Sequence, residues 1–391
     1  MFLKNNLKID YGIKEDKDEL YDLWQACFHD TKAFADYYFE RIFNHNRVIT
    51  LKEYDVIVSM LHLNPYRIYM NGNVIDADYI VGVATEETHR RKGYMRILLI
   101  SAMRQLYKEN KSFVYLMPAR ESIYTPFDFT FIYKQPVMDL KPARVNDSAD
   151  EFIIMSRQVD VNDLVILTEF SNAVLREQFD VFAYRDKNYF ENLLEETRIE
   201  DGQALLLYKG NELIGYAATA FSNDTANVNS SAHDNHLFIR ELIVLPEYLE
   251  QVYHWLKRYF RYKSGKLLLS ATKSPFYASE YRPIIMARII HLEEMMKLIR
   301  IPENFCIRLQ VADPILEGNN GKFLWAREWM MLPNSEPVDM VITIESLTSW
   351  LFGYKTLEKL LAEKSVYLYN DCREMLNRVG IIKKILLNEF V

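Results

Sequence analysis

The segment from Tyr79 to Ile100 (YIVGVATEETHRRKGYMRILLI) constrains the fold more than any other part of the chain. Its apolar, β-branched run from Ile80 to Thr85 predicts a strand, and the basic run that begins at Arg90 predicts the start of a helix that continues through Leu98 and Met103. A strand that leads into a basic, glycine-containing helix start can bind an anion, because the first helical N–H groups lack intrahelical acceptors and the helix dipole adds partial positive charge. Gly93 also lets the backbone approach a bulky pyrophosphate closely.

The class of anion follows from the motifs that this segment lacks. A nucleotide P-loop requires Gly-Lys-Ser/Thr and a dinucleotide site requires G-x-G-x-x-G, and neither pattern occurs. Arg-x-x-Gly alone is common and also fits a solvated, basic helix start. Directly after a strand, however, the pattern favours acyl-CoA. Its pyrophosphate can be bound without a metal ion and without the residues of a nicotinamide-binding site. The segment resembles the coenzyme A loop of the GNAT N-acetyltransferases.

Length and composition narrow the class of protein. A chain of 391 residues is expected to form two or three domains. The net charge of −7 argues against general nucleic-acid binding and favours cationic partners such as amines. Three widely spaced cysteines, which we expect to be buried free thiols, fit a reducing cytoplasm. Since the chain shows neither a signal peptide nor an apolar run long enough for a bilayer, we expect a cytoplasmic protein without membrane contact.

The order of predicted elements is that of an α/β (α+β) protein. In the first third, two helices (the second over residues 34–42), antiparallel strands that include 56–63 and 66–70, the loop and helix around Gly93, a strand, a short helix and a strand follow one another, which is the order of a GNAT domain. The middle third repeats this order weakly, but Pro246-Glu-Tyr-Leu-Glu250 replaces the basic loop. Glu247 and Glu250 would satisfy that helix start and repel a pyrophosphate. From about Pro302 a smaller αβ module follows, with a predicted hairpin turn at Gly318–Gly321, a strand over residues 322–329 and a helix C-cap at Gly353.

Two tandem GNAT units followed by a small αβ domain resemble the enhanced-intracellular-survival (Eis) acetyltransferase family. The motifs that carry the resemblance are Val83–Met95, Ile123–Phe129, Arg282–Arg288 and Leu347–Tyr354, the last of which looks like the family's sterol-carrier-like domain. The resemblance implies a GNAT domain with an acetyl-CoA site over residues 1–145, a degenerate GNAT domain over 146–300 and a sterol-carrier-like domain over 301–391. One departure is Asp128, which stands where the family usually has glycine.

The resemblance also implies roles for individual residues. Tyr124 would be the general acid that protonates the departing CoA thiolate, and the C-terminal carboxylate of Val391 would be the general base. Glu86 or Glu87, acting through water, is the competing base. The backbone at two strand positions would pair with the pantetheine amides, and six loop residues would surround the pyrophosphate: Val83 and Thr85, then Arg90, Arg91, Lys92, Gly93, Tyr94 and Met95.

The expected function is an acetyl-CoA-dependent N-acetyltransferase that uses acetyl-CoA as a substrate and no metal. Its acceptor would be a primary amine on an aminoglycoside-like, polyamine-like or lysine-containing small molecule or peptide, and the resemblance allows a homo-oligomer. The alternative is a non-catalytic carrier that binds an apolar ligand in its C-terminal module. His233 and His236 have metal-like spacing but no third ligand, so we interpret them as loop residues. Three acidic residues could either attract a cationic amine or be surface charge: Asp30, Asp36 and Glu389.

Overall fold

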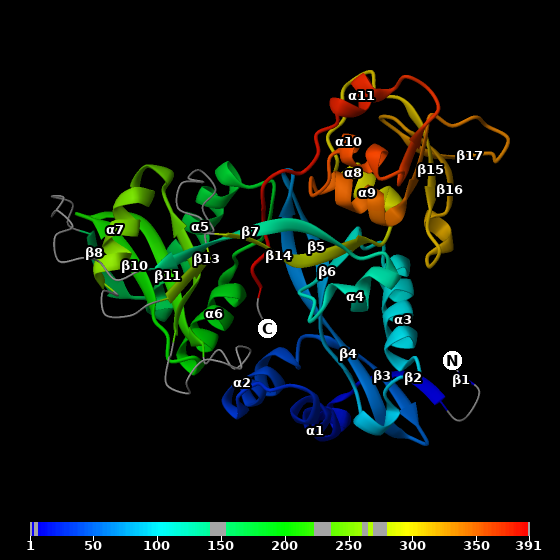
Figure 1. Ribbon diagram of the computed structural model, residues 1–391. Coiled ribbons are helices and arrows are strands. Elements are labelled where there is room, and N and C mark those ends of the chain that lie inside the picture. Colours follow the sequence, from blue (N-terminus) through cyan, green and yellow to red (C-terminus); the bar gives the residue numbers. More distant parts are fainter. Residues whose placement is uncertain are drawn as a thin grey trace. The chain divides into compact units, whose positions relative to one another are not determined.

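A computed structural model describes residues 2–3, 7–140, 154–222, 236–259, 265–268 and 280–389 of the chain (Figure 1). The chain forms two compact units. The first unit combines residues 1–133 with 284–383 and 390–391, and the second combines residues 134–283 with 384–389. Two strands, β7 and β14, carry the chain from one unit to the other, and each unit is described separately below.

The first unit begins with a twisted sheet in which the order of strands is β1-β2-β3-β4-β5-β6-β14. Neighbouring strands are antiparallel except for β5 and β6, which run parallel. The strands are β1 (Phe2–Leu3), β2 (Leu7–Tyr11), β3 (Arg47–Glu53), β4 (Val56–Met70), β5 (Asn73–Thr85), β6 (Phe113–Leu116) and β14 (Glu280–Ile289).

Helices cover both faces of this sheet because its strands alternate apolar side chains between the two faces. On one face, helix α3 (Tyr94–Lys108) packs Leu98, Leu99 and Met103 against strand residues such as Leu61. On the other face, α1 (Lys17–Cys27), α2 (Lys32–Tyr37) and the π-helical turn η2 (Tyr38–Ile42) form a separate aromatic core. The predicted helix over residues 34–42 is therefore an α-helix that continues as a π-helical turn.

Strand β4 corrects one expectation from the sequence. Asn64 and Pro65 favour a break between two strands, yet β4 is continuous over 15 residues. The proline is tolerated because β3 pairs with β4 only as far as Leu63, so the missing N–H of Pro65 removes no bond to β3. On its other side Pro65 lies opposite Asp78 of β5.

The first unit also contains the C-terminal module, shown in orange and red in Figure 1. Its five-stranded sheet has the order β17-β16-β15-β18-β19, and Phe305, Trp325 and Trp350 meet edge to face in its interior. Gly353 ends helix α9 with a left-handed φ of 68°, as predicted. The elements are α8 (Leu292–Lys297), β15 (Ile307–Ala312), β16 (Gly321–Trp325), β17 (Trp329–Leu332), β18 (Met340–Thr343), α9 (Ile344–Leu351), α10 (Leu357–Ala362), β19 (Val366–Leu368) and α11 (Arg373–Asn377).

The second unit has a sheet with the order β7-β13-β12-β11-β10-β8, in which β12 and β13 run parallel and the other neighbours antiparallel. Its short strands β9 and β20 also pair in parallel. The elements are β7 (Thr130–Leu140), β8 (Ile154–Gln158), α5 (Leu164–Gln178), β9 (Val181–Ala183), α6 (Lys187–Ile199), β10 (Ala204–Lys209), β11 (Glu212–Ser222), β12 (His236–Val244), α7 (Leu249–Tyr259), β13 (Gly265–Leu268) and β20 (Ile385–Leu386).

Several expectations need correction or cannot be compared. The predicted strand over residues 322–329 is two antiparallel strands, β16 and β17, separated by a turn. The turn at residues 318–321 instead contains a short 3₁₀ helix, η7 (Glu317–Asn319). Of the three thiols only that of Cys372 is buried, because Cys27 is half-buried and Cys306 is exposed, although all three are free. The expected boundary between residues 145 and 146 lies outside the described residues.

Candidate active site

The site begins where β5 and β6 separate. These parallel strands pair only at Asp78 with Val114 and at Tyr79 with Tyr115, whereas β5 continues to Thr85. Among the described residues no strand covers that side of β5 beyond Tyr79. The edge offers backbone N–H and C=O groups to a ligand that lies in the opening as an added strand would.

A bulge at Gly82 shapes the end of β5. The register between β4 and β5 shifts there, and Gly82 has a φ of +59°. A Cβ at this position would lie 2.5 Å from a ring carbon of Trp24, which leaves no space for a side chain. The bulge therefore depends on glycine both for its backbone conformation and for the packing of Trp24.

The basic loop lies between β5 and α3. The helix starts at Tyr94 with Gly93 as its N-cap, so Arg90 to Gly93 form a loop and not, as the sequence suggested, the first helical turn. Arg91 and Gly93 both have left-handed φ values, 65° and 82°. Alternation of this kind turns successive N–H groups toward one side, which makes an anion-binding concavity at the positive end of the helix. A Cβ at Gly93 would meet nothing within 4 Å, so this side of the loop is open.

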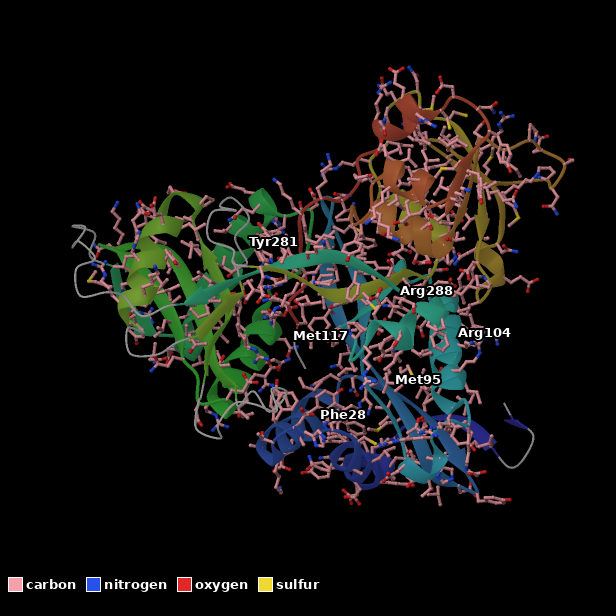
Figure 2. The ribbon with its side chains drawn as sticks, viewed as in Figure 1. Phe28, Met95, Arg104, Met117, Tyr281 and Arg288 are labelled. Atoms are coloured by element: carbon pink, nitrogen blue, oxygen red, sulfur yellow. The ribbon has the colours of Figure 1, made fainter. Side chains whose placement is uncertain are left out.

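The open edge of β5 and the basic loop border one cavity of about 460 Å³. Phe28 and Met95, labelled in Figure 2, contribute from the end of α1 and the start of α3. Seven of the eight predicted cofactor residues line this cavity, whereas Lys92 does not and instead lies 5.9 Å from the centre of the Tyr94 ring. Five further residues line the cavity without having been assigned to it from the sequence. Ala84, His89 and Ile123 lie within the motifs named above, whereas no motif gave a signal for Cys27 and Phe28.

Contacts within the protein fix the rim of the cavity. The Arg90 Nε donates to the Thr85 carbonyl at 3.2 Å, and the Thr85 hydroxyl lies 2.8 Å from that of Ser59. Arg90 also lies 3.8 Å from the Cys27 sulfur, whose thiol points at the same Thr85 carbonyl. The Thr85 carbonyl therefore already accepts hydrogen bonds from the protein. The part of the β5 edge that remains available to a ligand lies before Thr85 in the strand.

Tyr124 ends the short helix α4 (Glu121–Tyr124) directly after Ile123, the residue that lines the cavity. Its side chain is 7% exposed and packs edge to face on Phe129, with ring centres 6.0 Å apart. Burial raises the pKa of Tyr124 to about 12, so the phenol stays protonated at any physiological pH.

Asp128 keeps the turn that glycine would form in the family. It takes a left-handed φ of 60° and closes the 3₁₀ turn η4 (Thr125–Phe127) through a bond from its N–H to the Thr125 carbonyl. Aspartate tolerates this conformation better than most residues. Its carboxylate is half-buried 3.7 Å from the Arg288 guanidinium, and burial raises its pKa.

The candidate bases differ in their surroundings. Glu86 accepts bonds from the Thr88 N–H and from the Thr88 hydroxyl, and it pairs with His89 at 2.6 Å. The hydrogen bonds from Thr88, followed by that from His89, lower the pKa of Glu86 to about 2, which makes it a weak base. Val391 and His233 lie outside the described residues, and the described part of the chain holds no cluster of metal-ligating side chains.

The three acidic residues proposed to attract amines have different positions. Asp36 pairs with Lys32 at 2.7 Å, and Asp30 accepts a bond from the Trp24 indole. Glu389 is buried in the second unit, 3.6 Å from Arg185, so it is not surface charge. No helix among the described residues is both long and apolar enough to cross a membrane.

Comparison with known proteins matches this geometry. Residues 8–132 match the family model of the acetyltransferase (GNAT) domain, and residues 292–379 match that of the sterol carrier protein domain. A search of curated proteins gave no match.

Solved structures resemble the chain over nearly its whole length. A conserved protein from Enterococcus faecalis V583 is 15% identical over 98% of this chain and 99% of that one, with a TM-score of 0.78. A GCN5-related N-acetyltransferase from Anabaena variabilis is 15% identical over 98% and 100% of the two chains, with a TM-score of 0.80. Eis1 from Mycobacterium abscessus is 11% identical over 98% and 100%, with a TM-score of 0.73. Identities this low establish a shared fold. The family models show that the chain contains a GNAT acetyltransferase domain, and is therefore an enzyme, and that it contains a sterol carrier protein domain.

Proposed function

We propose that the protein transfers the acetyl group of acetyl-CoA to a primary amine in the cavity of its first unit. The observation that carries this proposal is the shared cavity, which is bordered by the open edge of β5 and by the left-handed loop at the start of α3. The first surface fits the amides of pantetheine, and the second fits a pyrophosphate. The side chains of Arg90 and Arg91 add positive charge at the phosphate end.

Tyr124 is the proposed general acid. Amide formation releases the CoA thiolate, which needs either a proton or a hydrogen-bond donor as the carbon–sulfur bond breaks. With a pKa of about 12, the Tyr124 phenol is always available as a donor, and it stabilises the thiolate through a hydrogen bond more readily than by complete proton transfer.

The proposed general base is the Val391 carboxylate, as the resemblance to the Eis family implies. The poor basicity of Glu86 supports this choice over Glu86 as the base. If the base is a backbone carboxylate, Val391→Ala should change turnover little, whereas residues added after Val391 should abolish acetylation. Full activity of the C-terminally extended protein, compared with an N-terminally extended control, would overturn the terminal base. Loss of activity only in Glu87→Gln would assign the role to Glu87.

The acceptor class we propose is an aminoglycoside-like, polyamine-like or lysine-containing amine, in an enzyme that acts in the cytoplasm. We further propose that the second unit is a degenerate GNAT domain without a CoA site. A carrier role for the C-terminal module is less well supported, because Trp325 and Trp350 fill its core, although Trp329 is only half-buried.

The test is release of free CoA thiol from acetyl-CoA in the presence of a library of primary amines. We expect amine-dependent thiol release. We also expect a product that is heavier than the amine by about 42 Da, the mass of an acetyl group less one hydrogen. An absence of CoA binding by the full chain would refute the proposal.

A further inference from the structure

The motif Arg282–Arg288 has no part in the proposed chemistry, yet it ends in a buried charge. The Arg288 side chain is 0% exposed and forms an ion pair with Asp313, with 2.6 Å between Nη2 and Oδ1. Figure 2 labels Arg288 on β14, next to the acetyltransferase domain. Asp313 belongs to the loop after β15 of the C-terminal module, so the pair joins β14 of the first sheet to that module.

The Asp313 carboxylate is held in place by its own domain. Its Oδ1 accepts bonds from the N–H groups of Ile315 and Leu316, both at 2.9 Å, and its Oδ2 accepts one from the Asn319 side chain at 2.9 Å. Asn319 in turn donates to the Ile290 carbonyl and accepts from the Leu292 N–H. Such a network leaves the guanidinium of Arg288 little freedom to move.

The same guanidinium holds the turn that follows Tyr124. Its Nε donates to the Phe127 carbonyl at 2.9 Å, and its Nη1 donates to the carbonyl of Ile289 at 2.9 Å. Its Nη2 lies 3.7 Å from Asp128, whose Oδ2 is buried and has no hydrogen-bond partner among the described residues. Arg288 is therefore the charge that compensates both aspartates, one from each domain.

This turn is coupled directly to Tyr124. The Phe129 N–H donates to the Tyr124 carbonyl at 3.4 Å, and the two rings pack edge to face. Phe127 belongs to the same buried cluster as Tyr124, and the Arg96 guanidinium lies over its ring at 5.5 Å. A shift of the Phe127 carbonyl would thus move the phenol relative to the cavity.

We propose that Arg288 is a positioning residue of the acetyltransferase site, which fixes the Tyr124 turn to Asp313 so that the C-terminal module is a working part of the site. This rests on the proposed role of Tyr124. A well-packed apolar pair would stabilise the fold as well as the buried Arg288–Asp313 ion pair does. What an apolar pair could not do is fix the Phe127 carbonyl in one place through hydrogen bonds.

The test compares Arg288→Lys, Asp313→Asn and the apolar double variant Arg288→Met with Asp313→Leu in the full chain. Lysine keeps the positive charge, but its ammonium group lacks the planar guanidinium geometry that bonds the Phe127 carbonyl and the Asp313 carboxylate at the same time. We expect all three variants to bind CoA within about twofold of the parent by calorimetry, since the loop is untouched, but to lose about 10- to 100-fold in kcat, because small displacements of a catalytic group cost that much. Arg308→Lys is the matched control, since Arg308 forms an ion pair with Asp339 at 2.8 Å in the same module without contacting the turn.

A second readout does not require the acceptor to be known. With ¹³C-labelled tyrosine, the signal that disappears in Tyr124→Phe identifies Tyr124, and we expect Arg288→Lys to shift it while Arg308→Lys does not. An unshifted Tyr124 signal or a kcat within twofold of the parent in folded Arg288→Lys would overturn the positioning role. If the parent enzyme acetylates no amine, the proposed function fails, whereas a shifted signal would still show that Arg288 positions Tyr124.

Discussion

The two units contain the same strand–turn–helix passage with opposite chemistry at its centre. In the first unit, β5 is followed by the 3₁₀ turn η3 (Glu87–His89) and then by four loop residues before α3 begins. In the second unit, β12 leads through Leu245 into the 3₁₀ turn η6 (Pro246–Tyr248), which continues directly into α7. The second unit therefore lacks the open loop, and its helix start carries Glu247 and Glu250 in place of arginine.

The strands before these turns differ in the same way. Both β5 and β12 have a register shift part of the way along, at Gly82 in β5 and at Arg240 in β12. Glycine leaves the bulge of β5 next to Trp24, whereas the Arg240 side chain is buried and pairs with Glu196 at 3.1 Å. The glycine bulge beside the proposed cofactor cavity of the first unit thus corresponds to a buried ion pair in the second unit.

The interior of the second unit extends this network. Arg185 is fully buried, pairs with Glu241, donates to Asn388 at 2.8 Å and lies 4.4 Å from the centre of the Tyr189 ring. Glu241 also accepts a bond from the Tyr216 hydroxyl. We therefore expect that a strand–turn–helix passage alone does not make a CoA site: an open loop, a glycine bulge and positive charge at the helix start must coincide.

The largest effect should come from reversing charge in the first unit. Arg90→Glu combined with Arg91→Glu should weaken CoA binding by about 3–6 kcal/mol, because each charge-assisted contact contributes about 1.5–3 kcal/mol. Calorimetry with CoA measures both the affinity and the number of sites, which we expect to be one per parent chain.

The matched control is Glu247→Arg combined with Glu250→Arg in the second unit. Since η6 leaves no open loop before α7, we expect these variants to keep a single site with the parent affinity. A second CoA site in the control would contradict this comparison of the two units. Unchanged CoA affinity in the variant Arg90→Glu with Arg91→Glu would contradict it as well.

The next effect concerns the reaction itself. Tyr124→Phe should lower kcat by about 10²- to 10⁴-fold, the usual contribution of a general acid, while the Kd for CoA stays the same. Tyr253→Phe on α7 is the control from the second unit, where we expect no change in rate. Turnover of Tyr124→Phe within about twofold of the parent would remove Tyr124 from the mechanism.

The sequence predicted most of what local chemistry determines. The GNAT order of elements, the left-handed cap at Gly353 and the basic loop could be recognised, because residue type and spacing set them directly. The continuous β4 could not, since it depends on where its partner β3 ends and not on the Asn64–Pro65 pair itself.

The composition of the cavity was predictable only in part. Residues of the loop motif were found, but Cys27 and Phe28 reach the cavity from α1, about 60 residues earlier in the chain, through packing that no local pattern records. The same holds for Arg288, whose motif was noticed while its partner Asp313 could be identified only from the structure. Contacts between distant segments are what the sequence alone could not supply.

A third test compares two glycines with the same backbone conformation, one from each unit. Gly82 and Gly210 both have a φ of +59°, but a Cβ would lie 2.5 Å from the Trp24 ring at Gly82 and would meet nothing within 4 Å at Gly210. Gly82→Ala should lower the free energy of unfolding by about 2–4 kcal/mol, through backbone strain of about 1 kcal/mol together with overpacking of about 1–3 kcal/mol.

Chemical denaturation of the two variants separates the contributions. Gly210→Ala carries only the strain, so we expect it to cost about 1 kcal/mol. Equal loss of stability in the two variants would show that packing against Trp24 adds nothing to the cost of a side chain at Gly82.

The smallest effect contrasts two carboxylates with opposite environments. Burial raises the pKa of Glu389 in the second unit to about 7, whereas hydrogen bonds from Thr88 and His89 lower that of Glu86 in the first unit to about 2. Between about pH 4.5 and 7 the folded protein keeps the Glu389 proton that the unfolded chain has lost. The free energy of unfolding should therefore fall as the pH rises through this window, by up to about 3 kcal/mol from Glu389 alone.

Glu389→Gln tests this sign, because a neutral amide of the same shape has no proton to lose. Neither carboxylate oxygen of Glu389 has a hydrogen-bond partner among the described residues, so the substitution breaks no hydrogen bond of this side chain within them. We expect urea denaturation to show the variant more stable than the parent at pH 8 and equal to it near pH 4.5. Glu86→Gln should do the opposite and lose stability at neutral pH, since its charged form is the one that the folded state favours. If Glu389→Gln were destabilised at pH 8, the carboxylate would be charged and paired with Arg185, and the interior of the second unit would be a complete ion-pair network.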